Sequence, residues 1–220
     1  MKKAVLIVLF LALASGASFA QTSIQGRSVD VRAFGAKCDG TTNDQTAIAA
    51  AISAVTSTGG IVNFPDGTCV VTGLTVPGGV TLQGKGKFTT ILKSGTNGVI
   101  LNLVQGSGDF AFRGPKIADL WVDGSDTGSS QIGIQVTDAS AVRDTIIENV
   151  TISDCGSHGL SIGNAFSSQF KNISSTSNQG YNFFYLAPNM PANYFYGLYS
   201  GDVSSSAPAG YRIKQGDFTC

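Results

Sequence analysis

The sequence predicts a single all-β domain, a parallel β-helix in which short strands stack coil upon coil behind one N-terminal helix. Three observations lead to this prediction. The 220-residue chain contains 28 glycines and only 13% charged residues, a composition typical of a β-rich fold with many turns. Strand-like segments recur 23 residues apart, and only one segment has the periodicity of an amphipathic helix.

The single helix is expected near Asn43–Thr56. Thr42 and Gln45 have the spacing of a capping box, and the glycines at 59 and 60 are expected to end the helix. Its apolar stripe consists of Ile48, Ile52 and Val55. The first coil of a solenoid exposes an apolar end, which an amphipathic helix can cover. We therefore expect an N-terminal cap over about residues 28–75 and stacked coils over about residues 76–220.

Two interleaved series of strands are expected in the rest of the chain. The first series consists of residues 116–124, 146–156 and 169–180, and the second of residues 132–136, 158–162, 181–185 and 210–214. From Asn149 to Asn172 is 23 residues, with no predicted helix in between, which is typical of one coil of a β-helix. We expect these two asparagines to form a side-chain ladder at corresponding turns. An antiparallel sandwich is the alternative, and the 23-residue period weighs against it.

Alternation along the strands predicts which side chains face the narrow core. Ile146, Val150 and Ile152 share one face of their strand and are expected inside. A single coil cannot bury such a core, so neighbouring coils must stabilise one another.

The segment from Val29 to Gly84 has the most specific pattern in the chain. It predicts a strand over Val29–Phe34, a Gly/Asp turn, the helix, and a hairpin of two strands around a Pro-Asp-Gly turn. The residues that match a family pattern are Phe34, Gly35, Ala36, Asp39, Gly40, Asp44, Ala47, Ile48, Gly60, Phe64, Pro65, Gly67 and Cys69. They resemble the entry segment of the pectate-lyase-like superfamily, in particular its rhamnogalacturonase/epimerase-like pectate lyase domain.

The resemblance implies a right-handed parallel β-helix and a polysaccharide partner, with uronic acids among the candidate sugars. It leaves the reaction open, because the superfamily includes hydrolases, lyases, epimerases and viral tailspikes. We expect a glycoside hydrolase or a polysaccharide lyase if the chain is an enzyme. The alternative is a non-catalytic polysaccharide-binding or cell-surface β-helix. The C-terminal residues do not resemble a cap, which indicates either missing coils or an edge covered by another subunit of a homo-oligomer.

The first twenty residues have the pattern of a secretion signal. Lys2 and Lys3 precede the apolar run Ala4–Ala14, and the small residues around Ala20 suit a signal peptidase. We expect a secreted or periplasmic protein with one domain over residues 21–220 and no membrane anchor after removal of residues 1–20. Without the two lysines the net charge is about −2, and a near-neutral chain without a basic run argues against a nucleic-acid partner.

Four cysteines remain after the signal, and export permits disulfides. Cys38 precedes the helix and Cys69 follows in the hairpin, so both flank one small cap and are expected to pair. A bond between Cys155 and Cys220 is a weaker expectation, because about three coils separate them.

The only histidine, His158, lies in the segment CGSHGLSIG, which is similar to a polygalacturonase segment. The resemblance implies that His158 supports catalytic carboxylates and that Arg212 and Lys214, in an Arg-Ile-Lys segment like that of the same family, bind the carboxylate of the substrate. Asp138 is the candidate acid or base. Two departures stand against this site: the chain has no Asp-Asp pair, and the distance from His158 to Arg212 corresponds to two coils. A polar turn residue is the alternative role for His158.

A second candidate site contains Asp119, Asp123 and Asp126, which could hold Ca²⁺ for a lyase. The alternative is an ordinary strand that ends in an Asp-Gly turn. No other cofactor is expected. Trp121 in the same strand is either a platform for a sugar ring or a core residue.

All six tyrosines lie between Tyr181 and Tyr211. Tyr181 and Tyr185 are candidates for sugar binding, because a tyrosine ring offers both an apolar face and a hydroxyl. The alternative is aromatic stacking inside the coils.

Overall fold

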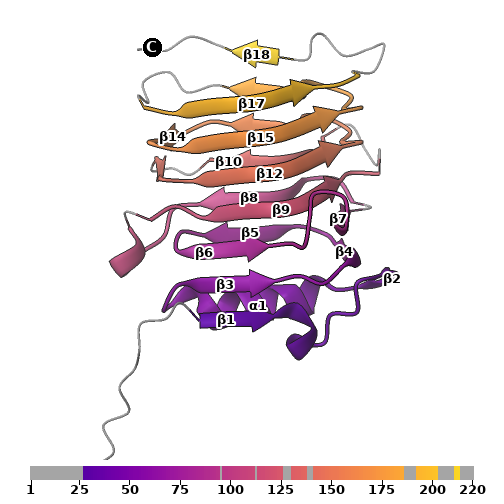
Figure 1. Ribbon diagram of the computed structural model, residues 1–220, viewed down its shortest axis with the longest axis vertical. Coiled ribbons are helices and arrows are strands. Elements are labelled where there is room, and N and C mark those ends of the chain that lie inside the picture. The colour runs from indigo at the N-terminus through magenta and orange to yellow at the C-terminus, as the bar shows by residue number, and fades with distance from the viewer. Residues whose placement is uncertain are drawn as a thin grey trace, which may run out of the picture.

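The computed structural model describes residues 27–94, 96–111, 113–125, 130–137, 141–185 and 192–202, and the backbone of residues 211–213. Its strands stack into a tall solenoid (Figure 1), and all the registered strand pairs are parallel. The expected parallel β-helix is therefore confirmed, and the antiparallel sandwich is excluded.

Each coil contributes strands to three walls. The first wall consists of β1 (Arg27–Asp30), β3 (Gly60–Asn63), β6 (Val80–Gln83), β9 (Lys116–Asp123), β12 (Ile146–Ser153), β15 (Gln169–Thr176) and β17 (Tyr194–Ser200). The second wall begins with β2 (Asp39–Asn43), β4 (Gly67–Val71) and β7 (Thr90–Ser94). The third wall consists of β5 (Leu74–Pro77), β8 (Val99–Val104), β10 (Ile132–Val136), β13 (Leu160–Ile162), β16 (Phe183–Tyr185) and β18 (Tyr211–Ile213).

A few short elements complete the described chain. A two-stranded sheet is formed by β11 (Val142–Arg143) and β14 (Ala165–Phe166), and the helical elements are η1 (Val31–Phe34), α1 (Gln45–Thr56) and η2 (Gly108–Phe110). No helix of the described residues is long and apolar enough to cross a membrane.

The expected coil length of 23 residues is confirmed by the strand registers. Ile147 of β12 pairs with Phe170 of β15, and Leu160 of β13 pairs with Phe183 of β16. Both predicted series of strands are present: β9, β12 and β15 form the first, and β10, β13, β16 and β18 form the second. The period therefore located the coils correctly.

Corners between the walls are made by single residues with a left-handed backbone. Asn149 has a φ of 54° and Asn172, one coil later, has a φ of 51°. Asn, Asp and Ser tolerate this conformation better than other side chains except glycine, because their short polar groups bond locally. The left-handed residue reverses the alternation within β12, so Ile147 is fully buried instead of the expected Ile146, while Val150 and Ile152 are buried as expected.

The upper and lower coils turn this corner differently. From β9 upward, the first and second walls are one continuous bent strand with the left-handed residue in its middle. Below β9, β6 and β7 are separate strands joined by residues 84–89. Figure 1 shows this connection (below, the corner loop) rising from the end of β6 alongside the higher coils before it returns into β7.

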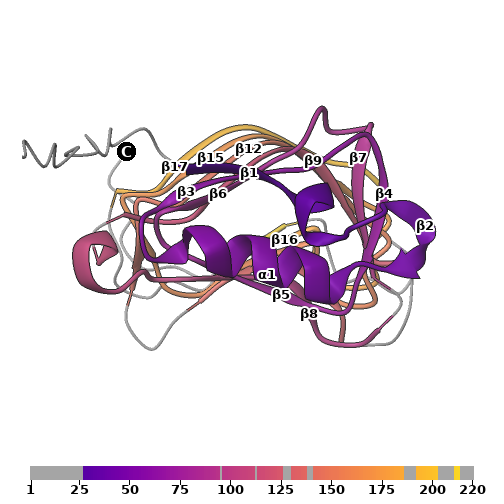
Figure 2. The ribbon, with the colours of Figure 1, turned by 90° about the horizontal axis from the view of Figure 1, so that it is seen from below.

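The helix α1 closes the lower end of the solenoid. Figure 2 shows it lying across the opening between the first and third walls. Its buried residues are Ile48, Ala51, Ile52 and Val55, so the expected cap is confirmed. The capping box is wrong: Thr42 bonds to Asp39, and the Gln45 side chain bonds to the backbone of residues 72 and 73. Asp44 occupies the N-cap position without a side-chain cap bond.

The entry segment differs from its prediction in two details. The first strand ends at Asp30, because the Asp30 carboxylate accepts the backbone N–H of Arg32 and starts the short helix η1. The strands β3 and β4 do not form a hairpin, since β3 pairs with β1 and β6 whereas β4 pairs with β2 and β7. The Pro-Asp-Gly turn is thus a corner between two walls.

The expected disulfide between Cys38 and Cys69 is present. Cys155 is buried, and its thiol lies 3.5 Å from the carbonyl oxygen of Ser153. Cys220 and the expected signal segment, residues 1–20, lie outside the described residues, so the second disulfide and export stay predictions.

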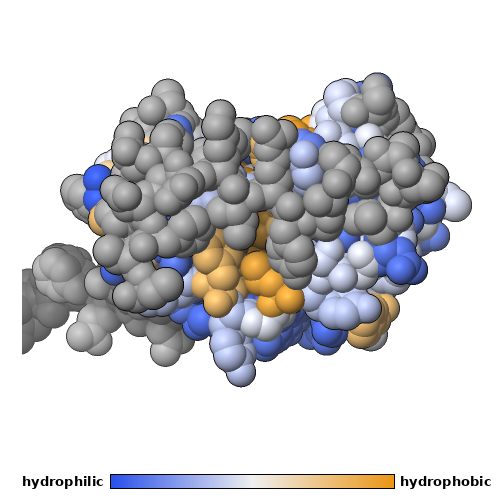
Figure 3. Space-filling model, turned by 90° about the horizontal axis from the view of Figure 1, so that it is seen from above, coloured by the Kyte–Doolittle hydropathy of each residue, from blue (hydrophilic) through white to orange (hydrophobic). Residues whose placement is uncertain are grey.

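The apolar core runs up the middle of the solenoid to the last described coil. Figure 3, a view of the upper end, shows a patch of hydrophobic side chains near the middle of that face. Phe170 of β15 is fully buried and stacks on Phe195 of β17, with 5.0 Å between the ring centroids.

Candidate functional site

A ladder of side-chain hydrogen bonds climbs the corner between the first and second walls. Gln83 Nε2 donates to Asp119 Oδ2 at 2.7 Å, and Asn149 Nδ2 donates to Asp119 Oδ1 at 3.1 Å. Asn172 Nδ2 then donates to Asn149 Oδ1 at 3.2 Å. The expected ladder of Asn149 and Asn172 is therefore confirmed, and it extends two coils further down the molecule.

Gly197 occupies the corner position above Asn172, with a φ of 64°. A Cβ atom there would lie 2.6 Å from Asn172 Oδ1, so a side chain at this position would collide with the ladder. The ladder thus ends at a position that only glycine fits, directly over Asn172.

A shallow groove of about 260 Å³ lies over the upper rungs and is called the ladder groove below. Its lining residues are Lys87, Asn149, Asn172, Ile173, Ser174, Gly197 and Tyr199. The two asparagines are exposed and offer amide groups to solvent. None of the lining residues is acidic, so the groove combines neutral hydrogen-bonding groups with one lysine and one tyrosine.

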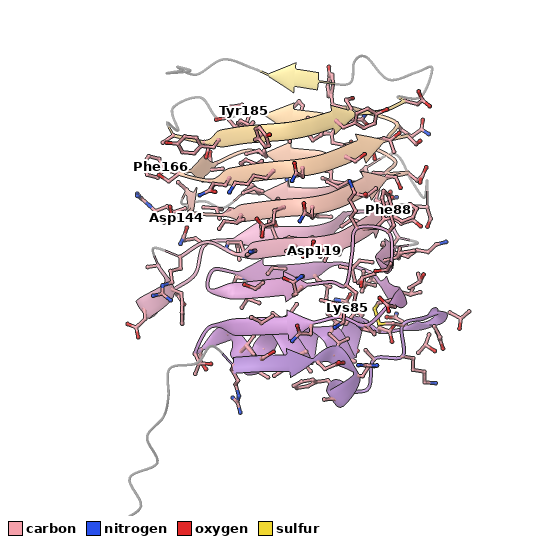
Figure 4. The ribbon with its side chains drawn as sticks, viewed as in Figure 1. Lys85, Phe88, Asp119, Asp144, Phe166 and Tyr185 are labelled. Carbon is pink, nitrogen blue, oxygen red and sulfur yellow. A yellow bond between two sulfur atoms is a disulfide. The ribbon has the colours of Figure 1, made fainter. Side chains whose placement is uncertain are left out.

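The corner loop forms one side of the ladder groove, and contacts with β9 hold it there. Phe88 packs edge-on against Trp121, with 6.4 Å between the ring centroids, and Trp121 Nε1 donates to Ser153 Oγ at 2.9 Å. Lys87 Nζ lies 5.2 Å from the centre of the Phe88 ring. Figure 4 labels Phe88 at the edge of the front wall, above Lys85. Lys87 is therefore presented by a packed loop, not by an isolated side chain.

The backbone of the corner loop is also bonded to its surroundings. The Gly86 N–H donates to the carbonyl oxygen of Asp119, and the Lys85 N–H donates to Thr90 Oγ1, both at 2.9 Å. Within the described part of the chain, Lys87 is in no ion pair. Its ammonium group is therefore available to a ligand in the groove.

Tyrosines on β17 form the upper end of the ladder groove and the surface beside it. Tyr199 lines the groove and is 65% exposed, and Tyr194, at the other end of the same strand, is also 65% exposed. Tyr196 is 73% exposed and lies in register with Lys171. Exposed tyrosine rings of this kind can pack against the apolar face of a sugar while the hydroxyl bonds to water or ligand.

Two ion pairs lie on the strands below and beside the groove. Lys116 Nζ lies 2.5 Å from Glu148 Oε1, and Lys93 Nζ lies 4.0 Å from Asp123 Oδ2. Such half-exposed pairs contribute little to stability. Among the described residues that line the groove, Lys87 is the one with a positive charge.

His158 lies at the turn before β13, away from the ladder. Its Nδ1 accepts the backbone N–H of Tyr181 at 3.0 Å, and its ring stacks on Phe184 with 4.5 Å between centroids. These contacts join one coil to the next, which fits the alternative interpretation of His158 as a polar turn residue. Its expected support of a catalytic carboxylate stays a prediction.

The partners expected for His158 are only partly described. Asp138 and Lys214 lie outside the described residues, and Arg212 is described by its backbone alone. Arg212 pairs with Phe184 of β16, which pairs with Ser161 of β13. The expected separation of two coils between the histidine segment and Arg212 is therefore confirmed, and the roles of Asp138, Arg212 and Lys214 stay predictions.

The two tyrosines expected to bind sugar are placed differently. Tyr185 is only 8% exposed and its hydroxyl accepts a bond from Asn193 Nδ2 at 3.1 Å, so its ring packs in the core and cannot stack on a sugar. Tyr181 is half-buried beside His158. Tyr185 instead packs edge-on against Phe195, with 5.5 Å between the ring centroids, which agrees with the alternative of aromatic packing inside the coils.

The acidic residues of β9 that the structure describes are engaged in hydrogen bonds, and the calcium site expected at Asp119, Asp123 and Asp126 stays a prediction. Both carboxylate oxygens of Asp119 accept ladder bonds, and Asp123 Oδ1 accepts the backbone N–H of Ser125 at 2.9 Å. Asp126 lies outside the described residues. The one group of three candidate ligands in the described part comprises Cys38, Asp44 and Cys69, and its two sulfur atoms are bonded to each other.

Sequence reasoning located the two upper rungs, Asn149 and Asn172, but missed Asp119 and Gln83 as rungs, and it missed Lys87, Phe88 and Tyr199 as residues of the site. The available signal was the length of the corner loop. Its residues 84–89 read Gly-Lys-Gly-Lys-Phe-Thr, where the coils above have one left-handed residue. Trp121 was expected as either a sugar platform or a core residue, and the structure places it half-buried on the outer face under Phe88.

Comparison with known proteins supports the fold and the entry segment. Residues 28–110 match the family described as "Rhamnogalacturonase A/epimerase, pectate lyase-like", as the entry motif led us to expect. No match was found among curated proteins.

Several solved structures have a similar fold. The A-module of mannuronan C-5 epimerase AlgE4 from Azotobacter vinelandii is 23% identical, with a TM-score of 0.65 over 78% of this chain and 50% of that one. ORF18 of Geobacillus virus E2 is 22% identical, with a TM-score of 0.63 over 82% of this chain and 39% of that one. An iota-carrageenase in complex with iota-carrageenan fragments is 17% identical, with a TM-score of 0.54 over 80% and 50%. The chain thus spans half or less of each of these structures.

Proposed function

We propose that this protein binds a polysaccharide in the ladder groove. The observation behind the proposal is the lining of the groove: exposed amides of Asn149 and Asn172, the ring of Tyr199 and the ammonium group of Lys87. Amides bond to sugar hydroxyls, a tyrosine ring packs on a sugar face, and a lysine attracts acidic substituents.

The similar structures support a polysaccharide as the partner. One of them is named as an epimerase of mannuronan, and another was solved in complex with carrageenan fragments. Export is a part of the same proposal, because residues 1–20 have the pattern of a signal peptide. An exported protein meets polysaccharides of the cell surface or the surroundings.

The side chains that line the ladder groove favour binding of a polysaccharide without cleavage. Glycoside hydrolysis uses two carboxyl groups on opposite sides of the glycosidic bond. The groove lining contains no carboxylate, and the nearby Asp119 is bonded at both oxygens. If the protein is a hydrolase, the candidates for its catalytic residues are Asp138 and His158, of which His158 lies outside the groove.

An affinity and turnover panel on the purified protein tests this proposal. Polygalacturonate, alginate, iota-carrageenan and a neutral glucan would each be tested by isothermal titration calorimetry. The same samples would be assayed for new reducing ends and for unsaturated products, with and without Ca²⁺. We expect binding of at least one polysaccharide and no product in either assay. Absence of binding by a folded protein would refute the proposal, and product formation would establish an enzyme and direct mutagenesis to Asp138 and His158.

A further inference from the structure

We infer that the bound polysaccharide lies along the axis of the solenoid, across successive coils, with an acidic group of the sugar chain at Lys87. The inference rests on the proposed function and specifies the direction and the charge of the ligand at the same groove. The lining residues, the ladder and the corner loop each contribute to it.

The direction follows from where the lining residues lie. Asn149 belongs to β12, Asn172 to β15, and Gly197 and Tyr199 to β17. These strands are consecutive neighbours in the first wall, about 4.8 Å apart. The groove therefore crosses the strands instead of following one of them. An extended chain of linked pyranose rings advances by a similar distance per sugar, so successive sugars can face successive coils.

The ladder makes the floor of the groove repeat from coil to coil. Asn149 and Asn172 are in equivalent positions with nearly equal backbone angles, φ 54° and 51°. Each amide uses one N–H in the ladder, and an amide nitrogen has two. The second N–H of each rung can therefore donate to a ligand oxygen, once per coil.

The upper end of the groove suits the face of a sugar ring. Gly197 has no side chain, and Tyr199 beside it is largely exposed. At this level the groove is lined by a tyrosine ring, where the coil below presents an asparagine amide. A sugar at this position can pack against the tyrosine instead of bonding to an amide.

The lower end suits an acidic substituent. Lys87 is the one charged residue of the lining, and the Phe88–Trp121 contact fixes the loop that presents it. A carboxylate or a sulfate ester would satisfy the ammonium group equally well in charge. The shared requirement is an anionic sugar at Lys87, while another sugar of the same chain packs on the ring of Tyr199.

Two tyrosines of β17 provide a matched test of the direction. Tyr199 and Tyr194 are equally exposed and lie on the same strand, but only Tyr199 lines the groove. Five residues separate them, which corresponds to about 16 Å along the strand. A ligand along the axis contacts Tyr199 alone, whereas a ligand that follows β17 contacts both.

The experiment is a titration of purified full chain with acidic oligosaccharides of two to six sugars, by isothermal titration calorimetry. Oligogalacturonates and iota-carrageenan oligosaccharides supply the carboxylated and sulfated forms, and neutral oligosaccharides of the same lengths are the reference. We expect Tyr199→Ala to lower affinity about tenfold for the longer oligosaccharides and less for disaccharides, because a shorter ligand contacts fewer of the lining residues at once. Tyr194→Ala is expected to change nothing. Equal losses in both variants, or no loss in Tyr199→Ala, would overturn the axial direction.

The charge is tested by Lys87→Gln, with Lys87→Arg and the distant exposed Lys37→Gln as controls. Loss of the cation is expected to lower affinity for acidic oligosaccharides about tenfold and to reduce the salt dependence of binding, because a charged hydrogen bond is removed. Lys87→Arg and Lys37→Gln should bind as the wild type does. An unchanged affinity of Lys87→Gln would overturn the role of Lys87. Failure of every oligosaccharide and polymer to bind the wild type would instead refute the proposed function itself.

Discussion

The N-terminal cap and the ladder groove use the same kinds of side chain for opposite purposes. In the cap, the carboxylate of Asp44 is 1% exposed and accepts backbone N–H groups from Lys37, Cys38 and Val70. In the groove, the amides of Asn149 and Asn172 are exposed and bond to side chains of the neighbouring coils. The difference teaches that polar residues at the entry hold the fold together, whereas polar residues at the corner remain available for a ligand.

The largest expected effect is the loss of the cap disulfide. Replacing both Cys38 and Cys69 by serine should lower the free energy of unfolding by about 3 kcal/mol, because the unfolded chain regains the freedom of a loop of roughly thirty residues. Denaturant unfolding of the purified variant measures the change. Dithiothreitol should destabilise the wild type to the level of the variant and leave the variant unchanged. A wild type as stable with the reductant as without it would contradict the role given to this bond.

The next effect is expected at Asp44, at the centre of the cap. Asp44→Asn puts an amide nitrogen among three N–H donors and should cost about 2 kcal/mol of unfolding free energy. The exposed Asp66, changed to asparagine in the same way, should cost less than about 0.5 kcal/mol. Urea unfolding measures both variants. Equal losses of unfolding free energy would contradict the claim that the buried carboxylate of Asp44 stabilises the cap more than an exposed carboxylate does.

Smaller effects are expected at the ladder. Asn149→Ala should cost about 1 kcal/mol, since alanine tolerates the left-handed backbone poorly and also loses two ladder bonds. Asn149→Gly keeps the backbone relaxed, so it isolates the contribution of the bonds and should cost less than alanine does. Thermal unfolding followed by circular dichroism measures both. A loss in Asn149→Ala as large as that in Asp44→Asn would show that the ladder is a structural element as important as the cap.

The smallest effect concerns the exposed turn of the entry segment. The backbone N–H groups of Thr42 and Thr41 bond to the Asp39 carboxylate and lower its pKa well below the usual value of 3.8. A lowered pKa in the folded state stabilises the protein fully above about pH 4, and this contribution fades as the pH falls below that value. Urea unfolding between pH 7 and pH 2.5 should show Asp39→Asn less stable than the wild type at pH 7, with the gap closing in acid. A gap that is constant with pH would contradict the ionised turn.

The sequence contained enough information for the coils and the cap but not for the groove. The 23-residue spacing of Asn149 and Asn172 located equivalent turns, because stacked coils repeat one local pattern. Flanking positions were enough to pair Cys38 with Cys69. Ile146 was placed wrongly inside the core, because nothing in a period-two pattern shows that Asn149 takes a left-handed backbone and reverses the alternation.

The groove depends on contacts between residues far apart in the chain. Lys87 reaches rungs that follow it by more than sixty residues, and it does so because Phe88 packs on Trp121. The composition and periodicity of a sequence do not predict which distant residues come into contact. His158 was proposed as a site residue because its local segment resembles a polygalacturonase. In the structure its ring accepts a hydrogen bond from the backbone of the next coil and stacks on Phe184.

A crystal structure with a bound acidic hexasaccharide tests the central claim most directly. The account predicts sugar density over the ladder groove, running from Lys87 past Asn149 and Asn172 to Tyr199. Sugar density on the outer face of the third wall near His158, with the ladder groove empty, would contradict it.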